Sequence, residues 1–114
     1  MSDLTLICET CRFPINGDTG CIYTTFAEIR TSLEDRSDEI RWRTSHYAHF
    51  TESDRDTYEI SSERITTWRQ LIWWTAHLME KNWFPLSDWD ELMREVSGDI
   101  PSRRILVAAG EAAA

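Results

Sequence analysis

Two cysteines near the start of the chain have a spacing that suits metal binding or thiol redox chemistry. Cys8 and Cys11 form a C-x-x-C motif, which in a reducing compartment is typical either of half a zinc site or of a redox-active dithiol. A dithiol of the thioredoxin type precedes a long helix, whereas Pro14, Asn16 and Gly17 follow this motif and indicate a turn. The context therefore favours metal binding.

Two histidines would complete a tetrahedral site. His46 and His49 form an H-x-x-H motif, and 34 residues separate it from Cys11. Because a DNA-binding finger has a gap of only ~12–15 residues, we predict instead two facing knuckles that each follow a strand. The predicted site is a structural Zn²⁺ bound by Cys8, Cys11, His46 and His49. Four protein ligands leave no position for water, so no catalytic residue is predicted and an enzyme is not expected.

The third cysteine competes for a place in this site. Cys21 lies in a run with high strand propensity, from Gly20 to Phe26. We expect it to be a buried strand residue, the usual place of an unpaired thiol. A Cys₃His site that uses Cys21 and one of the two histidines is the alternative. An odd number of cysteines without a secretory signal argues against a disulfide framework.

Short strands are expected to position the ligands. Phe26, Ile29 and Leu33 are spaced three and four residues apart, so segment 26–35 predicts a short amphipathic helix. A continued strand followed by a loop is the alternative for this segment. The other expected elements are strands at 4–7, 40–43 and 57–60 and a hairpin at 12–26 with its loop at 16–20.

The C-terminal half predicts two helices. Apolar residues repeat every three or four positions over 61–82, where a serine can cap the helix start and Pro85 stops its continuation. A second helix over 87–97 would begin at a serine cap and end at Gly98. Its expected buried stripe is Trp89, Leu92, Met93 and Val96.

Together these elements predict an α+β fold. A small zinc-ribbon-like β part with two knuckles would pack on the C-terminal helical pair. We expect a single zinc-stabilised domain over 1–100, with the knuckle part in 1–60 and the helical part in 61–97. Residues 101–114 are expected to form a flexible tail, although segment 105–107 is apolar enough to dock on the domain.

The charge balance disfavours nucleic acid as a partner. The net charge is −8 and the pI about 4.8, and residues 1–60 carry 12 acidic but only 6 basic side chains. Acidic residues interrupt the basic cluster of Arg36, Arg41, Arg43 and Arg55, so a zinc-ribbon transcriptional regulator that binds nucleic acid is the second hypothesis. No apolar run approaches the ~20 residues of a membrane span, and a cytoplasmic location is expected.

Two groups of residues are candidates for binding a protein partner, which is the leading hypothesis. Asp35, Asp38 and Glu39 belong to an acidic stretch that suits a basic partner surface. Trp73 and Trp74 extend past the apolar stripe of the first C-terminal helix. If exposed they form an aromatic docking patch, and if the helix is covered on both sides they belong to the core.

Three segments resemble small uncharacterised proteins of actinobacteria and their phages. They are Cys8 to Ile15 with the Gly-Asp turn that follows, Trp42 with His46, and Trp74 to Trp83. The resemblance implies a cytoplasmic, zinc-stabilised accessory protein, encoded by a phage or mobile element, that acts on a host component. The relatives often carry a cysteine at the position of His49, and either residue type binds zinc.

Overall fold

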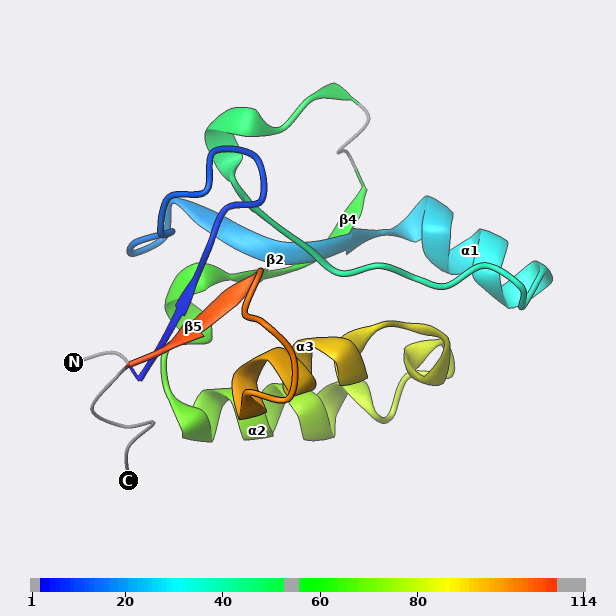
Figure 1. Cartoon of the computed structure of the whole chain (residues 1–114). Helices are drawn as coiled ribbons and strands as arrows, with labels where there is room; N and C mark the ends of the chain where they lie inside the picture. The colour runs from blue at the N-terminus through cyan, green and yellow to red at the C-terminus, as the bar shows by residue number, and fades with distance from the viewer. Residues whose placement is uncertain (1–2, 53–55, 109–114) are drawn as a thin grey trace.

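Five short strands and three α-helices make up the described part of the computed structural model, which covers residues 3–52 and 56–108. The strands are β1 (Leu4–Leu6), β2 (Gly20–Thr25), β3 (Arg43–His46), β4 (Thr57–Ser61) and β5 (Ile105–Val107). The helices are α1 (Phe26–Glu34), α2 (Trp68–Leu78) and α3 (Trp89–Ser97), with 3₁₀ turns η1 (Tyr47–His49), η3 (Ser62–Arg64) and η4 (Phe84–Leu86). The α+β class expected from the element pattern is confirmed (Figure 1).

The larger sheet has the strand order β3-β2-β4, and both pairings are antiparallel. Five consecutive residues of the central strand β2 are buried, which suits its β-branched and aromatic side chains. Cys21 lies opposite Ser45 of β3 and Ser61 of β4 and is fully buried. The expectation of a buried strand cysteine is therefore confirmed.

The smaller sheet joins the two ends of the described chain. β1 pairs antiparallel with β5, with Leu6 opposite Ile105. The prediction of a flexible tail over 101–114 is therefore wrong for segment 105–107, because β1 supplies its backbone hydrogen-bond partners and the core covers Ile105. Residues 109–114, the last part of the predicted tail, lie outside the described residues.

The predicted hairpin at 12–26 is wrong. The segment before β2 meets the preceding chain at an isolated bridge between Ile7 and Pro14, and β2 pairs with β3 and β4. Both of these strands come later in the sequence, so the turn signal at Gly17 could not identify the partners of β2. The predicted strand at 57–60 is confirmed by β4.

Helix α1 confirms the amphipathic pattern at 26–35. The Thr25 hydroxyl caps its first turn by accepting from the backbone N–H of Glu28 at 3.1 Å. Ile29 and Ser32 face the protein interior. The alternative of a continued strand is therefore excluded for this segment.

Helix α2 is shorter than the predicted helix over 61–82. It begins after Thr67, which forms a capping box with Gln70, and it ends at Leu78. The residues before the cap form β4 and the turn η3. The three β-branched residues at 65–67 separate that turn from the helix, consistent with the low helix propensity of such residues.

Helix α3 ends at Ser97, and Gly98 caps it as predicted, with a left-handed φ of 88°. It begins one residue later than expected, because Asp88 rather than Ser87 precedes its first residue. Ile40, predicted to begin a strand at 40–43, instead forms a parallel bridge to Ser87, and β3 begins at Arg43. This bridge joins the β part to the start of α3.

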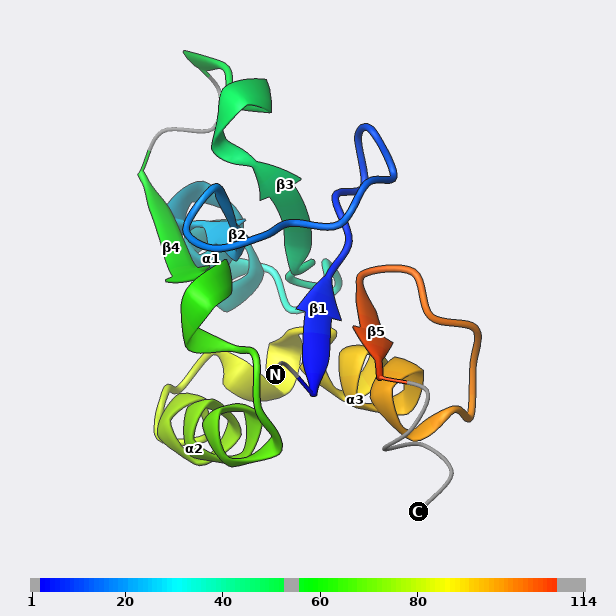
Figure 2. The same ribbon diagram turned by 90° about the vertical axis from the view of Figure 1, so that its left-hand side faces the viewer.

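The hydrophobic core lies between the sheets and the helical layer. Helices α2 and α3 lie side by side beneath the strands, as two perpendicular views show (Figures 1 and 2). Trp42 is almost fully buried and packs against Trp83 and Trp89 at ring-centroid distances of 5.9 and 5.1 Å. None of the helices in the described ranges combines the length and the apolar character that a membrane span requires.

Candidate metal centre

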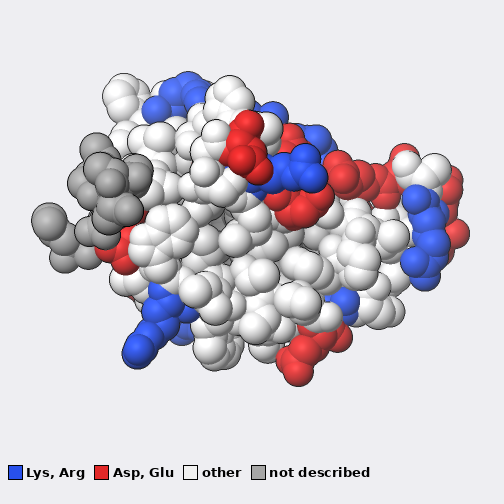
Figure 3. All heavy atoms as spheres, turned by 60° about the horizontal axis from the view of Figure 1, so that its bottom comes forward, with Lys and Arg blue, Asp and Glu red and all other residues white. Residues whose placement is uncertain are grey.

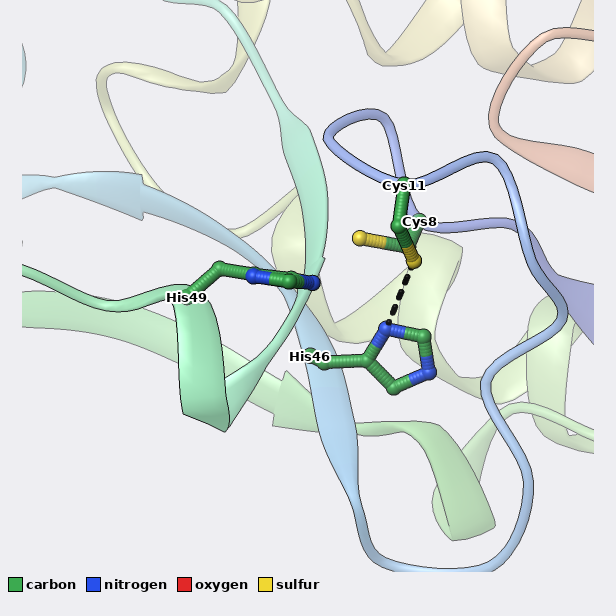
Figure 4. Close-up of side chains that lie close together, drawn as sticks. All are labelled: Cys8, Cys11, His46 and His49. Atoms are coloured by element: carbon green, nitrogen blue, oxygen red, sulfur yellow. Dashed lines mark hydrogen bonds between the residues drawn. The ribbon is translucent and has the colours of Figure 1, made fainter.

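The segment from Cys8 to Cys11 forms a tight loop soon after β1. The Arg12 N–H donates to the Cys8 carbonyl at 2.8 Å, and the Cys8 N–H donates to the Phe13 carbonyl at 3.0 Å. Arg12 adopts a left-handed φ of 67°, a conformation that reverses the chain direction at a modest energetic cost. The loop therefore presents both thiols to the same side, as expected for a knuckle (Figure 4).

The two histidines come from the end of β3 and the 3₁₀ turn that follows. His46 is the last residue of β3, and His49 is the last residue of η1. Strand β3 is held by β2, where Gly20 lies opposite His46. The Tyr47 N–H donates to the Thr19 carbonyl at 2.9 Å, which continues this attachment into η1.

Backbone and side-chain hydrogen bonds attach the cysteine loop to β3. The Glu9 N–H donates to the Thr44 carbonyl at 3.0 Å, and the Glu9 carboxylate accepts from the Thr44 N–H at 3.1 Å. The Thr44 hydroxyl donates to the Ile7 carbonyl. Glu9, the residue after Cys8, thus positions the site, a role that no sequence motif indicates because its partner lies 35 residues away.

All four predicted ligands lie together. Cys8, Cys11, His46 and His49 each offer one donor atom, and these atoms lie within 4.8 Å of one another (Figure 4). The Cys11 Sγ lies 3.4 Å from the His46 Nδ1. Two sulfur and two imidazole nitrogen donors in such a group could hold a metal ion.

The ring of His46 is oriented for coordination. Its Nε2 lies 3.2 Å from the Pro14 carbonyl oxygen, which can only accept a hydrogen bond, so Nε2 carries the hydrogen. Nδ1 is then left with a lone pair on the side of Cys11. Metal-bound histidines commonly donate their other ring N–H to a backbone carbonyl in this way.

The environment of Cys8 favours its thiolate. Burial raises the pKa of the Cys8 thiol, but hydrogen bonds from the backbone N–H groups of Cys11, His46 and Thr10 outweigh this effect and lower the pKa to about 6. The thiolate is the form of cysteine that binds metal. The loop thus favours the form of Cys8 that a metal site requires.

The four predicted ligands differ in their exposure. Cys8 is buried, Cys11 and His46 are half-buried, and His49 is exposed. The site therefore opens to solvent on the side of η1. His49 is the ligand that depends least on the core for its position.

Cys21 does not belong to this group. Its thiol donates to a Glu59 carboxylate oxygen at 3.6 Å, and burial together with the charge of Glu59 raises its pKa to about 12. A neutral thiol is a poor metal ligand. The alternative Cys₃His site is therefore wrong in its choice of Cys21, because β2 directs this side chain toward β4 rather than toward the cysteine loop.

The predicted acidic residues follow α1, and one of them lines a cleft. Asp35, Asp38 and Glu39 are all exposed. A hydrogen bond from Ser37 lowers the pKa of Asp35. Glu39 lines a cleft of about 510 Å³ that continues over η4 and the start of α3. A neighbouring hollow of about 350 Å³ is lined by Asp38, Glu39 and α1.

The two predicted tryptophans contact each other on α2, with ring centroids 4.9 Å apart, but differ in exposure. Trp73 is 57% exposed, and its ring stacks on His77 at 5.0 Å with an interplanar angle of 8°. Trp74 is half-buried and packs against the core. Asp38 and Glu39 line other hollows than the tryptophans do, and Trp73 is the more exposed of the two tryptophans.

Comparison of the chain with protein-family models, curated proteins and solved structures finds no match.

Proposed function

We propose that the protein is a small binding module whose fold is stabilised by one structural Zn²⁺ at Cys8, Cys11, His46 and His49. The observation that carries the proposal is the meeting of these four donor atoms within 4.8 Å from two segments far apart in the sequence. In a tetrahedral zinc site the donor atoms are about 3.3–3.8 Å apart. The distance of 3.4 Å between the Cys11 and His46 donors lies in that range.

A structural role suits the position of the site. The metal would link the loop after β1 to the end of β3, and thus the smaller sheet to the larger one. Four protein ligands leave no open position for substrate or water, which supports a non-enzymatic role. Binding of zinc would add its free energy to that of folding, as it does in other small zinc domains.

Elemental analysis with ligand variants tests the metal site. The purified chain is expected to bind about one Zn²⁺, and Cys8→Ser or Cys11→Ser is expected to lose both the metal and the cooperative thermal transition. Cys21→Ser is the matched control, because it removes a thiol outside the site and should leave the zinc content unchanged. Wild-type protein that binds no zinc when the ion is supplied would contradict the proposal.

We further propose that the module binds and modulates a basic protein, with a host factor as the partner of a phage- or mobile-element-encoded chain. Support comes from the exposed carboxylates of Glu39 and Asp90 in the cleft, to which Asp38 in the neighbouring hollow adds a third. The half-buried side chains of Phe84 and Met93 supply apolar area in the same cleft. Acidic side chains at the rim accelerate association with a basic surface.

The nucleic-acid alternative has less support. Arg43 forms an ion pair with Glu28 at 2.5 Å, and Arg41 lies 4.0 Å from the buried carboxylate of Asp88. Their charges are thus partly neutralised within the chain. Arg55, another member of the predicted basic cluster, lies outside the described residues.

Charge reversal tests whether the acidic side chains take part in binding the partner. A variant with Asp35, Asp38 and Glu39 replaced by Lys should associate more slowly with a partner that has been isolated by its binding to the wild-type protein. The decrease in association rate should be largest at low salt. The control replaces the exposed residues Asp18, Glu63 and Asp99 by Lys, which changes the net charge equally. Equal association rates for both variants across a salt titration would reject the cleft as the binding surface.

A further inference from the structure

The outward face of α2 exposes large apolar side chains. Ile72 is 65% exposed, Trp73 57% and Met79 65%, and Trp68 is 37% exposed at the start of the helix. The face of the molecule that includes this helix is mostly neither acidic nor basic, with charged side chains around it (Figure 3). Apolar patches of this kind on soluble proteins commonly mark interaction sites.

Two opposite charges flank this face at the two ends of the helix. Arg69 lies in the first turn, and Glu80 follows the last one; both are exposed. Glu80 lies two residues beyond Leu78, in the turn that continues α2, where its N–H donates to the His77 carbonyl. Eleven residues of ideal helix would span about 16 Å and return to within about 20° of the same face, which places Glu80 on the side of Arg69. Within residues 3–52 and 56–108, no ion pair to either side chain is present.

The macrodipole of α2 itself does not explain these charges. The N-terminus of a helix is its positive end and the C-terminus its negative end. Arg69 and Glu80 therefore each lie at the end of α2 that disfavours their charge. A neighbouring helix that runs in the opposite direction reverses this relation, because its negative end then lies beside Arg69.

We propose that this face binds a second copy of the chain, with the two α2 helices antiparallel about a two-fold axis. If the axis passes between residues 74 and 75, Arg69 lies opposite Glu80 of the second copy, and the symmetric pair repeats this contact. An isologous interface of this kind is self-complementary. A parallel arrangement would instead place Arg69 against Arg69 and Glu80 against Glu80.

The same register matches a large side chain with a small one. Trp73 lies opposite Ala76 of the second copy. Ala76 belongs to a shallow hollow of about 290 Å³, which Trp73, His77 and Glu80 also line. The indole of one copy would enter the hollow of the other, and aromatic side chains buried near an interface centre often contribute most of the binding free energy.

A charge-swap series tests the proposed dimer. We expect the metal-loaded full chain to shift from the mass of one copy, 13.4 kDa, toward twice that mass in sedimentation equilibrium between about 5 and about 500 µM. Arg69→Glu and Glu80→Arg should each weaken the dimer at least about tenfold, because each places like charges opposite one another. The double variant restores opposite charges and should return within about threefold of wild type.

Two aromatic substitutions test whether the dimer contact involves the exposed face of α2 or another exposed aromatic side chain. Trp73→Ala should weaken the dimer more than about tenfold. Phe13→Ala is the matched control, because Phe13 is 69% exposed on the cysteine loop, away from α2. Circular dichroism and metal content should stay at the wild-type level in every variant, since all the altered side chains are exposed. If Trp73→Ala does not fold, the charge-swap series alone decides.

Several outcomes would overturn the proposal. These are a wild-type chain that is monomeric at every concentration, a double variant no better than the single ones, or a dimer that Trp73→Ala leaves intact. A monomer whose α2 variants lose binding of another protein would assign the face to that partner instead. None of the altered residues belongs to the metal centre or the acidic cleft, so these results are independent of the proposed function.

Discussion

The guanidinium of Arg104 and the carboxylate of Glu95 form a fully buried ion pair. Arg104 Nε donates to Glu95 Oε2 at 2.8 Å, and the other Glu95 oxygen accepts the backbone N–H groups of Arg103 and Arg104 at 2.8 and 2.7 Å. These bonds lower the pKa of Glu95 although its burial acts in the opposite direction. The pair joins α3 to the residue that precedes β5.

A second carboxylate extends this network into the β part. Arg104 Nη1 donates to Asp88 Oδ2 and to the Trp42 carbonyl, both at 3.0 Å, and Asp88 Oδ1 accepts the Trp42 N–H at 2.8 Å. One side chain thus contacts the start of α3, its last turns and the segment before β3. This explains why Asp88 does not cap α3 with its side chain.

Removal of Arg104 should therefore be strongly destabilising. Arg104→Met leaves the carboxylates of Asp88 and Glu95 buried without their cation, and we expect the free energy of unfolding to fall by about 3–5 kcal/mol. Urea denaturation measures the change. Arg94→Met, at an exposed position of α3, is the control and should cost less than about 0.5 kcal/mol. Similar losses for the two variants would contradict the structural role of the buried pair.

The stability of the protein should decrease at alkaline pH because of Cys21. The folded chain holds the pKa of this thiol at about 12, whereas an unfolded cysteine titrates near about 8.5. The unfolded state therefore loses its proton first, and the stabilising contribution, complete below about pH 8.5, decreases as the pH rises toward 12.

Cys21→Ala removes this contribution and leaves the other cysteines in place. Between about pH 8 and pH 10, the free energy of unfolding of the wild-type chain should fall by about 2 kcal/mol more than that of the variant. Urea unfolding under reducing conditions measures both. Parallel pH profiles of the two proteins would show that Cys21 ionises equally easily in the folded and unfolded chain.

Gly20 should be required for the position of His46. A Cβ atom at Gly20 would lie 2.9 Å from the His46 Cα and 2.8 Å from the Ile15 Cγ2, so Gly20→Ala must displace β3. We expect a loss of about 1–3 kcal/mol in stability together with weaker zinc binding. Competition with a chromogenic chelator measures the zinc affinity.

Gly17→Ala is the matched control for this variant. Gly17 has a φ of 60°, but a Cβ atom added there would meet no other heavy atom within 4 Å. Only backbone strain of about 1–2 kcal/mol is therefore expected, and zinc affinity should stay at the wild-type level. If both glycine variants weaken zinc binding equally, the effect of Gly20→Ala is a general loss of stability and not a displacement of His46.

The two histidines should contribute unequally to metal binding. His46 is held by β3 and the Pro14 carbonyl, whereas His49 is exposed. His46→Ala should weaken zinc binding by more than about 100-fold, beyond the effect typical of outer-shell changes. His49→Ala should have a smaller effect because water can reach the vacated position, and His49→Cys should retain the metal. Chelator titration distinguishes these outcomes; equal losses at both positions would contradict them.

The sequence by itself determined the elements and groups that depend on local pattern. The spacing of the two cysteines and two histidines identified the group that could hold a metal ion, because few other residues in the chain can serve as soft ligands. The helical periodicity of α1 and the end of α3 at the Gly98 cap were also predicted from the sequence. Both depend only on neighbouring residues, through the 3.6-residue repeat and the left-handed cap.

The tertiary structure decided which distant segments pair and which side chains they bury. Ile105 was assigned to a tail, whereas β1 supplies its pairing partner in the structure, and no local pattern indicated that Arg104 and Glu95 are buried together. Trp73 and Trp74 are adjacent in sequence, but only packing of α2 on the core separates the exposed one from the half-buried one. These outcomes depend on contacts between residues far apart in the chain, and a buried charge is tolerated only where such contacts provide its counter-charge.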